Sequence, residues 1–192
     1  MGLQTPDGVS VELNKSTSDY NEGYLIAMEP EHHKIHEETH FECCDVDLDV
    51  DIATPKYWHI LTPDSDVRCH FNFEVGTSLP GTLSLFEAPT VAAEGEGDAL
   101  TVYNNDRNSS NTADVLVYKD PTISADGTDL IYVALLGNPG LTPNGASGGV
   151  TQRNREFILK ADTSYAIKFL AINDDTLITM CLSWYEVENE ND

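Results

Sequence analysis

Short apolar segments recur along the chain from residue 41 onward. They are rich in β-branched and aromatic residues, and they are separated by Gly, Pro, Asn, Asp or Ser at intervals of about 8–15 residues. Four of them read FECCDVDLDVDI (41–52), VRCHFNFEV (67–75), SYAIKFLAI (164–172) and TLITMCLSWYEV (176–187). No segment has the pattern of a long amphipathic helix. We therefore expect an all-β fold, a jelly-roll or β-sandwich, in a single domain.

The N-terminal segment has a different composition. Residues 1–24 are mostly polar and include TPDG and NKSTSDYNEG, so we expect an extended N-terminal arm, followed by the jelly-roll or sandwich domain over 25–192. A chain of 192 residues fits one domain of this kind. The Gly- and Pro-rich connection at 136–156 and the polar connection at 104–114 are predicted contact loops, because long loops in compact domains are often functional.

The sequence DVDLDVDI at 45–52 alternates strictly between acid and apolar residue. It starts like a calcium loop, but Val50 and Lys56 occupy the positions where an EF-hand needs Gly and Glu. A period of two predicts a strand whose four aspartates share a solvated face, while the apolar set (Val46, Leu48, Val50, Ile52) faces the core. The alternatives are a cation site between subunits, with Asp45 and Asp47 as candidate ligands, and a catalytic site.

A second polar cluster contains His32, His33, His36 and His40. The letters HEETH at 36–40 match the zinc-protease pattern, and on a helix His36 and His40 would share one face at the spacing of two zinc ligands. That chemistry needs a buried helix and a third ligand, whereas this segment is charged throughout and lies between Pro30 and a predicted strand. We expect a polar surface segment, with a metal site and a metalloprotease as alternatives.

The four cysteines lie in strand-like stretches without CxxC spacing. Buried free thiols are favoured over a disulfide or a metal site, and Cys43 and Cys44 should point to opposite faces of a strand. Aromatic residues at 57, 58, 184 and 185 could form a platform for a sugar ring. In β-rich segments, core and interface positions are the favoured interpretation.

Charge excludes two classes of partner. Ten Lys and Arg against 33 Asp and Glu give a net charge of −23, which disfavours nucleic acid and anionic membranes. The first residues do not resemble a signal peptide, and no apolar run is long enough for a membrane helix, so we expect synthesis and folding in a cytoplasm. GASGG at 145–149 has the letters of GxSxG but lacks the flanking strand-to-helix pattern, and the sequence contains no Walker A or strand-linked GxGxxG motif, so we expect no enzyme and no cofactor.

Five further segments lie between about residues 45 and 187: DVDIATPKYWHILTP (49–63), LFEAPTV (85–91), ALTVYNNDRNSSNTADVLVYKDPTI (99–123), REFILKADTSYAIKF (155–169) and LSWYEV (182–187). In pattern and order they resemble a family of small β-rich accessory proteins of tailed-virus capsids. The resemblance implies a decoration or cement protein on the capsid surface of the virion. Its partners would then be the major capsid protein and further copies of itself, often in a homotrimer. An adhesion or receptor-binding module that recognises a host-surface glycan remains the alternative.

Overall fold

The computed structural model of the protein describes residues 3–4, 10–14, 24–26, 30–92, 97–137 and 156–188. Most of the predicted contact loop at 136–156 lies outside these residues. The connection at 104–114 lies within them.

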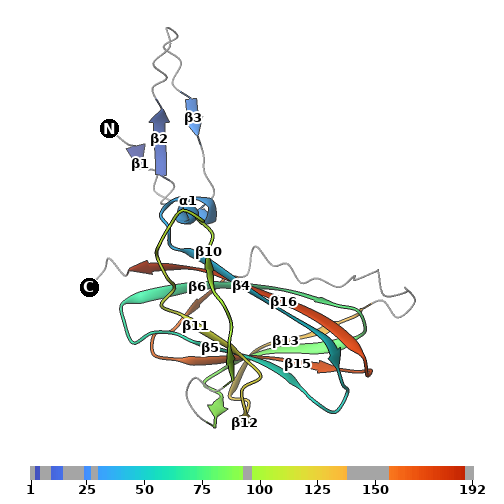
Figure 1. Cartoon of the computed structure of the whole chain (residues 1–192). Coiled ribbons are helices and arrows are strands. Elements are labelled where there is room, and N and C mark those ends of the chain that lie inside the picture. The colour runs from blue at the N-terminus through green and yellow to red at the C-terminus, as the bar shows by residue number, and fades with distance from the viewer. Residues whose placement is uncertain are drawn as a thin grey trace.

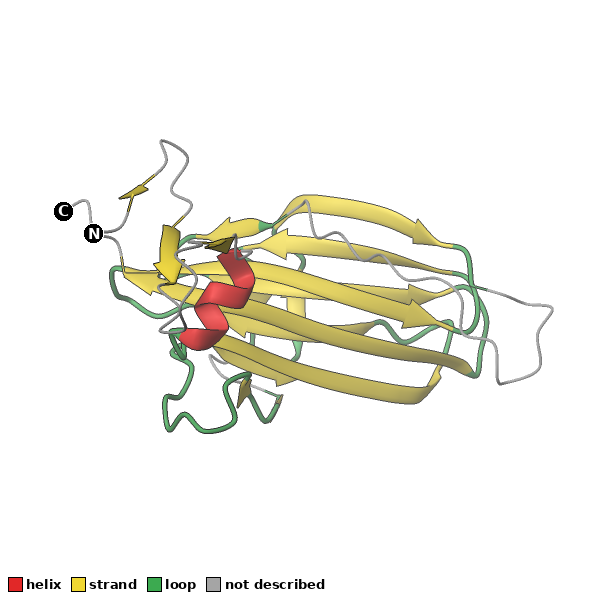
Figure 2. Cartoon of the chain, turned by 90° about the horizontal axis from the view of Figure 1, so that it is seen from above, coloured by secondary structure: helices red, strands yellow, loops and turns green. Residues whose placement is uncertain are grey.

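Two antiparallel sheets face each other as a sandwich (Figure 1), and their long strands run side by side in the view from above (Figure 2). The first has five strands, in the order β10 (Tyr103–Asn104), β4 (His40–Val50), β16 (Thr176–Glu188), β6 (Val67–Thr77) and β14 (Phe157–Leu159). The second has six strands, in the order β13 (Thr128–Leu135), β7 (Gly81–Glu87), β15 (Ser164–Ala171), β5 (Lys56–Leu61), β11 (Leu116–Lys119) and β9 (Asp98–Ala99).

The pairing of the eight principal strands is nested along the chain. β4 pairs with β16, β5 with β15, β6 with β14 and β7 with β13, so the first strand pairs with the last and the pairs close inward. This nesting gives the strand orders 4-16-6-14 and 13-7-15-5 in the two sheets. It is the topology of a jelly roll, and the prediction of an all-β jelly-roll or sandwich is confirmed.

Smaller elements lie outside the sandwich. A two-stranded ribbon joins β8 (Thr90–Val91) to β12 (Ile123–Ala125). A three-stranded sheet of β1 (Leu3–Gln4), β2 (Ser10–Asn14) and β3 (Tyr24–Ile26) lies beyond the short helix α1 (Pro30–His36), away from both large sheets (Figure 1). In the part of the chain that the structure describes, no helix is long and apolar enough to span a bilayer.

The core fills the space between the two sheets. Its largest fully buried side chains come from both layers, and they include Trp58, Ile60, Phe71, Tyr165, Phe169 and Trp184. Trp58 and Trp184 are 0% and 1% exposed, and Tyr185 is also buried. These three residues are therefore unavailable as a sugar platform. The core interpretation is confirmed for Trp58 and Trp184, whereas Tyr185 stacks on His70. Tyr57 is half-buried on the other face of β5.

The orientation of β4 is the reverse of the one expected from its acidic half. Val46, Leu48 and Ile52 are 53%, 67% and 50% exposed, whereas Asp45 is buried. The prediction that the four aspartates lie on a solvated face and the apolar set on the core face was therefore wrong for Asp45, which is buried, for Asp47, which is half-buried, and for the three exposed apolar residues. It is confirmed for Asp49 and Asp51, which are exposed. The physical reason is the first half of the strand, where Phe41 and Cys43 are buried in the core at the same parity as Asp45.

A bulge then changes the parity near the end of β4. Thr176 pairs with Val50 and Ile178 with Asp47, so three steps along β4 oppose two along β16. The extra residue returns Val50 to the core, where it is 4% exposed. Of the four apolar residues expected in the core, only Val50 is buried there.

Candidate functional site

The outward face of β4 carries two exposed apolar residues, Val46 and Leu48, and Ile52 is exposed in the turn that follows the strand; we call these three uncharged residues, each at least half exposed, the β4 row. Its neighbours across the sheet are small, because Thr179 pairs with both Val46 and Gly76. A Cβ built on Gly76 would meet no atom within 4 Å, so the face beside Val46 is open. A large apolar surface in contact with water is typical of a binding surface.

The inward face of β4 carries an ionic cluster between the two sheets. Lys56 on β5 places its Nζ 2.9 Å from Asp47, 2.8 Å from Asp120 and 3.8 Å from Asp45. Asp45 also lies 3.6 Å from Lys119 Nζ. Two of the four acids expected to face water, Asp45 and Asp47, therefore neutralise lysines that project inward from the opposite sheet.

The pKa values of this cluster follow from its contacts. Burial would raise the pKa of Asp47, but the hydrogen bond from Lys56 and the backbone N–H of Asp49 outweigh it, and the pKa is lowered. Burial would likewise lower the pKa of Lys56, but hydrogen bonds to Asp120 and Asp47 raise it. Asp45 and Asp47, the candidate metal ligands, are thus bound to ammonium groups, and this arrangement is structural.

The histidine cluster is split between two elements. Helix α1 ends at His36, Glu38 has a φ of 61°, and His40 begins β4. His36 and His40 are therefore not one turn apart on a helix, so the arrangement that a zinc protease needs is absent from HEETH. The helical pair is instead His32 and His36, whose Nε2 atoms are 3.2 Å apart on the surface.

Glu38 and His40 anchor the connection at 104–114. Glu38 accepts hydrogen bonds from Ser109 and Asn111, and its carbonyl accepts one from Asn104. The Nδ1 of His40 lies 2.9 Å from the side-chain nitrogen of Asn105. The second glutamate and the second histidine of HEETH thus hold a loop in place.

The cysteines divide into two pairs. Cys44 on β4 and Cys181 on β16 are direct partners across the ladder and form a disulfide, with 4.2 Å between their Cα atoms. Cys43 and Cys69 are buried free thiols, and burial raises the pKa of Cys43 to about 12. The expectation of four free thiols was wrong for Cys44 and Cys181, because the register of two strands 137 residues apart brings them together. The expectation that Cys43 and Cys44 face opposite sides is confirmed.

One serine–histidine pair was not predicted from the sequence. The Nε2 of His59 lies 2.5 Å from Ser164 Oγ. However, His59 is 0% exposed, and its Nδ1 has no hydrogen-bond partner among the described residues. Burial lowers its pKa. Nucleophilic catalysis needs a base that is oriented by a third group and can reach substrate, and this pair meets neither condition.

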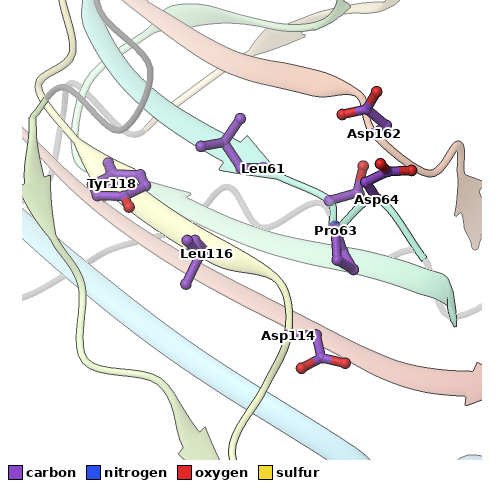
Figure 3. A pocket seen from close by; sticks show the side chains of 8 residues that line it. Leu61, Pro63, Asp64, Asp114, Leu116, Tyr118 and Asp162 are labelled. Atoms are coloured by element: carbon purple, nitrogen blue, oxygen red, sulfur yellow. The ribbon is translucent and has the colours of Figure 1, made fainter.

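A shallow hollow of about 360 Å³ lies where the end of β5 meets the start of β11, and Leu61 and Leu116 are among the residues that line it (Figure 3). Asp64, Asp114 and Asp162 surround it, and Leu116 and Tyr118 from β11 form part of its wall. An aromatic ring beside carboxylate acceptors can bind a polyhydroxylated ligand such as a sugar.

No protein-family model matches this chain, and no curated protein or solved structure matches it either.

Proposed function

We propose that this protein is a non-enzymatic virion structural protein that decorates or cements the capsid shell of a tailed virus and binds its partner through the β4 row. The observation that carries the proposal is the exposure of Val46 and Leu48 on β4, and of Ile52 in the turn that follows it, in a jelly roll. Jelly rolls are common in viral capsid proteins and in lectins, so the fold supports the proposal by analogy alone.

The charge of the protein favours this face as the contact. A molecule with a net charge of −23 repels further copies of itself wherever acidic surfaces meet. The β4 row is uncharged, and its burial would contribute roughly 25 cal/mol per Å² of apolar area. It can therefore support contact with the major capsid protein or with other copies in a homotrimer on the capsid surface.

The experiment uses two substitutions that should prevent a partner from binding to the β4 row, one by its bulk and one by its charge. Gly76→Arg places a long side chain into open space, and Leu48→Asp puts a charge in the row; neither disturbs the core. We expect both variants to keep the urea midpoint of the wild type but to lose co-sedimentation with shells of the major capsid protein encoded in the same genome. Oligomer mass is measured in parallel by light scattering.

The matched control is Leu136→Asp, since Leu136 is 79% exposed beyond the end of β13 in the other sheet. It should bind as the wild type does. Wild-type protein that stays monomeric and does not bind shells would contradict the proposal.

A second candidate function, an adhesion module for a host-surface glycan, is favoured by the hollow beside Tyr118. Glycan-array binding that is lost in Tyr118→Ala and kept in Tyr132→Ala, on a tyrosine 66% exposed in β13, would support it. Shell binding that is unchanged in Tyr118→Ala would separate the two functions.

A further inference from the structure

Three metal-ligating side chains meet on the outward face of the five-stranded sheet. Glu42 and Cys44 project from β4 and Cys181 from β16, and one ligand atom of each lies within 4.8 Å of the other two. A carboxylate oxygen of Glu42 is 3.7 Å from the sulfur of Cys44. Cys44 is exposed and Cys181 and Glu42 are half-buried, so solvent reaches the group.

We propose that reduction of the Cys44–Cys181 disulfide turns this group into a binding site for a soft divalent cation such as Zn²⁺, with Glu42 as the third ligand. The inference does not rest on the proposed function. Two thiolates and one carboxylate are a ligand set that zinc uses, and the fourth position would be taken by water.

The chemistry balances with a thiol or phosphine reductant. The reductant supplies two electrons, the S–S bond breaks, and each sulfur takes one proton. Binding of the cation then releases both protons to solvent, because the thiolate is the ligand. When the disulfide is present, neither sulfur is a thiolate, so the oxidised protein binds the cation poorly.

The sheet holds the ligands at a suitable separation after the disulfide opens. β16 is hydrogen-bonded to β4 on one side and to β6 on the other, so the two cysteines remain opposite each other without their covalent bond. Tetrahedral zinc with Zn–S bonds of about 2.3 Å needs sulfurs about 3.8 Å apart. Side-chain rotation can supply this distance over a Cα separation of 4.2 Å.

The remaining cysteines cannot replace this site. Cys43 and Cys69 are buried in the core, and burial raises the pKa of both thiols. The exposed histidine pair on α1, His32 and His36, could also bind zinc and is removed separately in the experiment.

The test titrates the full chain with Zn²⁺ against a chromogenic chelator, before and after reduction with a phosphine and anaerobic desalting. We expect one equivalent of zinc to bind the reduced protein, with release of two protons, and none to bind the oxidised protein. Cd²⁺ should give the ultraviolet charge-transfer band of a metal thiolate. His32→Ala/His36→Ala should bind as the wild type does.

Two variants identify the ligands. Cys44→Ser/Cys181→Ser should lose zinc binding and the cadmium band. Glu42→Gln keeps both cysteines and the fold, and it should weaken zinc binding about tenfold or more, whereas Glu188→Gln should not. Reduced wild type without zinc, or zinc retained by Cys44→Ser/Cys181→Ser, would overturn the site, and unchanged affinity in Glu42→Gln would overturn the three-ligand assignment.

Discussion

The indole N–H of Trp58 donates a hydrogen bond to the carboxylate of Asp45, with 2.9 Å between Nε1 and Oδ2. Trp58 lies on β5 and Asp45 on β4, so the bond joins the two sheets through the interior of the sandwich. Both residues are buried. The acid at the start of DVDLDVDI is therefore a polar bridge in the core.

Removal of this bridge should destabilise the protein strongly. Asp45→Ala leaves the Trp58 donor unsatisfied and takes a partner from Lys56 and Lys119, so we expect a loss of about 3–5 kcal/mol in the free energy of unfolding in urea. Asp66→Ala, at an exposed turn, should change it by less than about 0.5 kcal/mol. Equal effects of the two substitutions would show that Asp45 is not a buried bridge.

The ionic contacts should make the protein sensitive to acid. The pKa values of Asp47 and Asp126 lie below 3.8 in the folded state, where Lys56 and Lys168 donate to them against the effect of burial. Such groups stabilise the fold above their unfolded pKa, and this contribution is lost as the pH falls through their folded pKa. We expect the free energy of unfolding to fall as the pH drops from 5 toward 3.

The lysine partners provide the control for this experiment. Lys56→Met/Lys168→Met should lower the free energy of unfolding at pH 7 and make it depend less on pH between 5 and 3. Lys160→Met removes an exposed pair with Glu87 and should leave the slope unchanged. A slope that is as steep in Lys56→Met/Lys168→Met as in the wild type would disprove the assignment.

Asp49 should be unfavourable at neutral pH. Repulsion from Asp51 and Asp175 raises its pKa, so its ionised form opposes folding. Asp49→Asn should therefore raise the urea midpoint at pH 7, and the gain should disappear in acid as the wild-type carboxyl takes up a proton. Asp66→Asn is the matched exposed control. A midpoint that falls in Asp49→Asn would mean that the side chain has a stabilising contact.

Thiol labelling checks the disulfide. Native oxidised protein should react with no equivalent of iodoacetamide at pH 8, because Cys43 and Cys69 are buried and the pKa of Cys43 is raised to about 12. Unfolding without reductant should expose two thiols, and unfolding with reductant should expose four. Mass spectrometry of peptides identifies the sites; label on Cys44 in the oxidised protein would contradict the pairing with Cys181.

The fold class could be predicted from the sequence because each strand shows its own alternation, composition and flanking turn residues. The direction in which β4 faces could not be predicted from residues 45–52 alone. Phe41 and Cys43 lie on one face of the strand and Val46 and Leu48 on the other, and both sets could face the core. The register with β16 decides between them, because its inward residues Met180 and Ile178 pair with Asp45 and Asp47. The lysines of β5 and β11, Lys56 and Lys119, form ion pairs with Asp45 and Asp47 and so stabilise these carboxylates on the inward face.

The functional residues were less accessible to sequence reasoning. The Cys44–Cys181 bond depends on the register between two strands that are distant in the sequence, and the residues next to each cysteine do not indicate this register. The exposure of Val46 and Leu48 follows from the parity of the strand, and that of Ile52 from the turn after it. One signal was present in the sequence. Phe41 and Cys43 are an even number of residues from Asp45, so a strand that buries them also points Asp45 inward.

The nested pairing has a consequence for synthesis of the protein. β16 occupies the middle of the five-stranded sheet and is the last of its strands to leave the ribosome. Until residues 176–188 emerge, β4 and β6 have no common neighbour, and their inner edges are open to pairing with other nascent chains. Folding of the five-stranded sheet is therefore completed only after β16 has been translated.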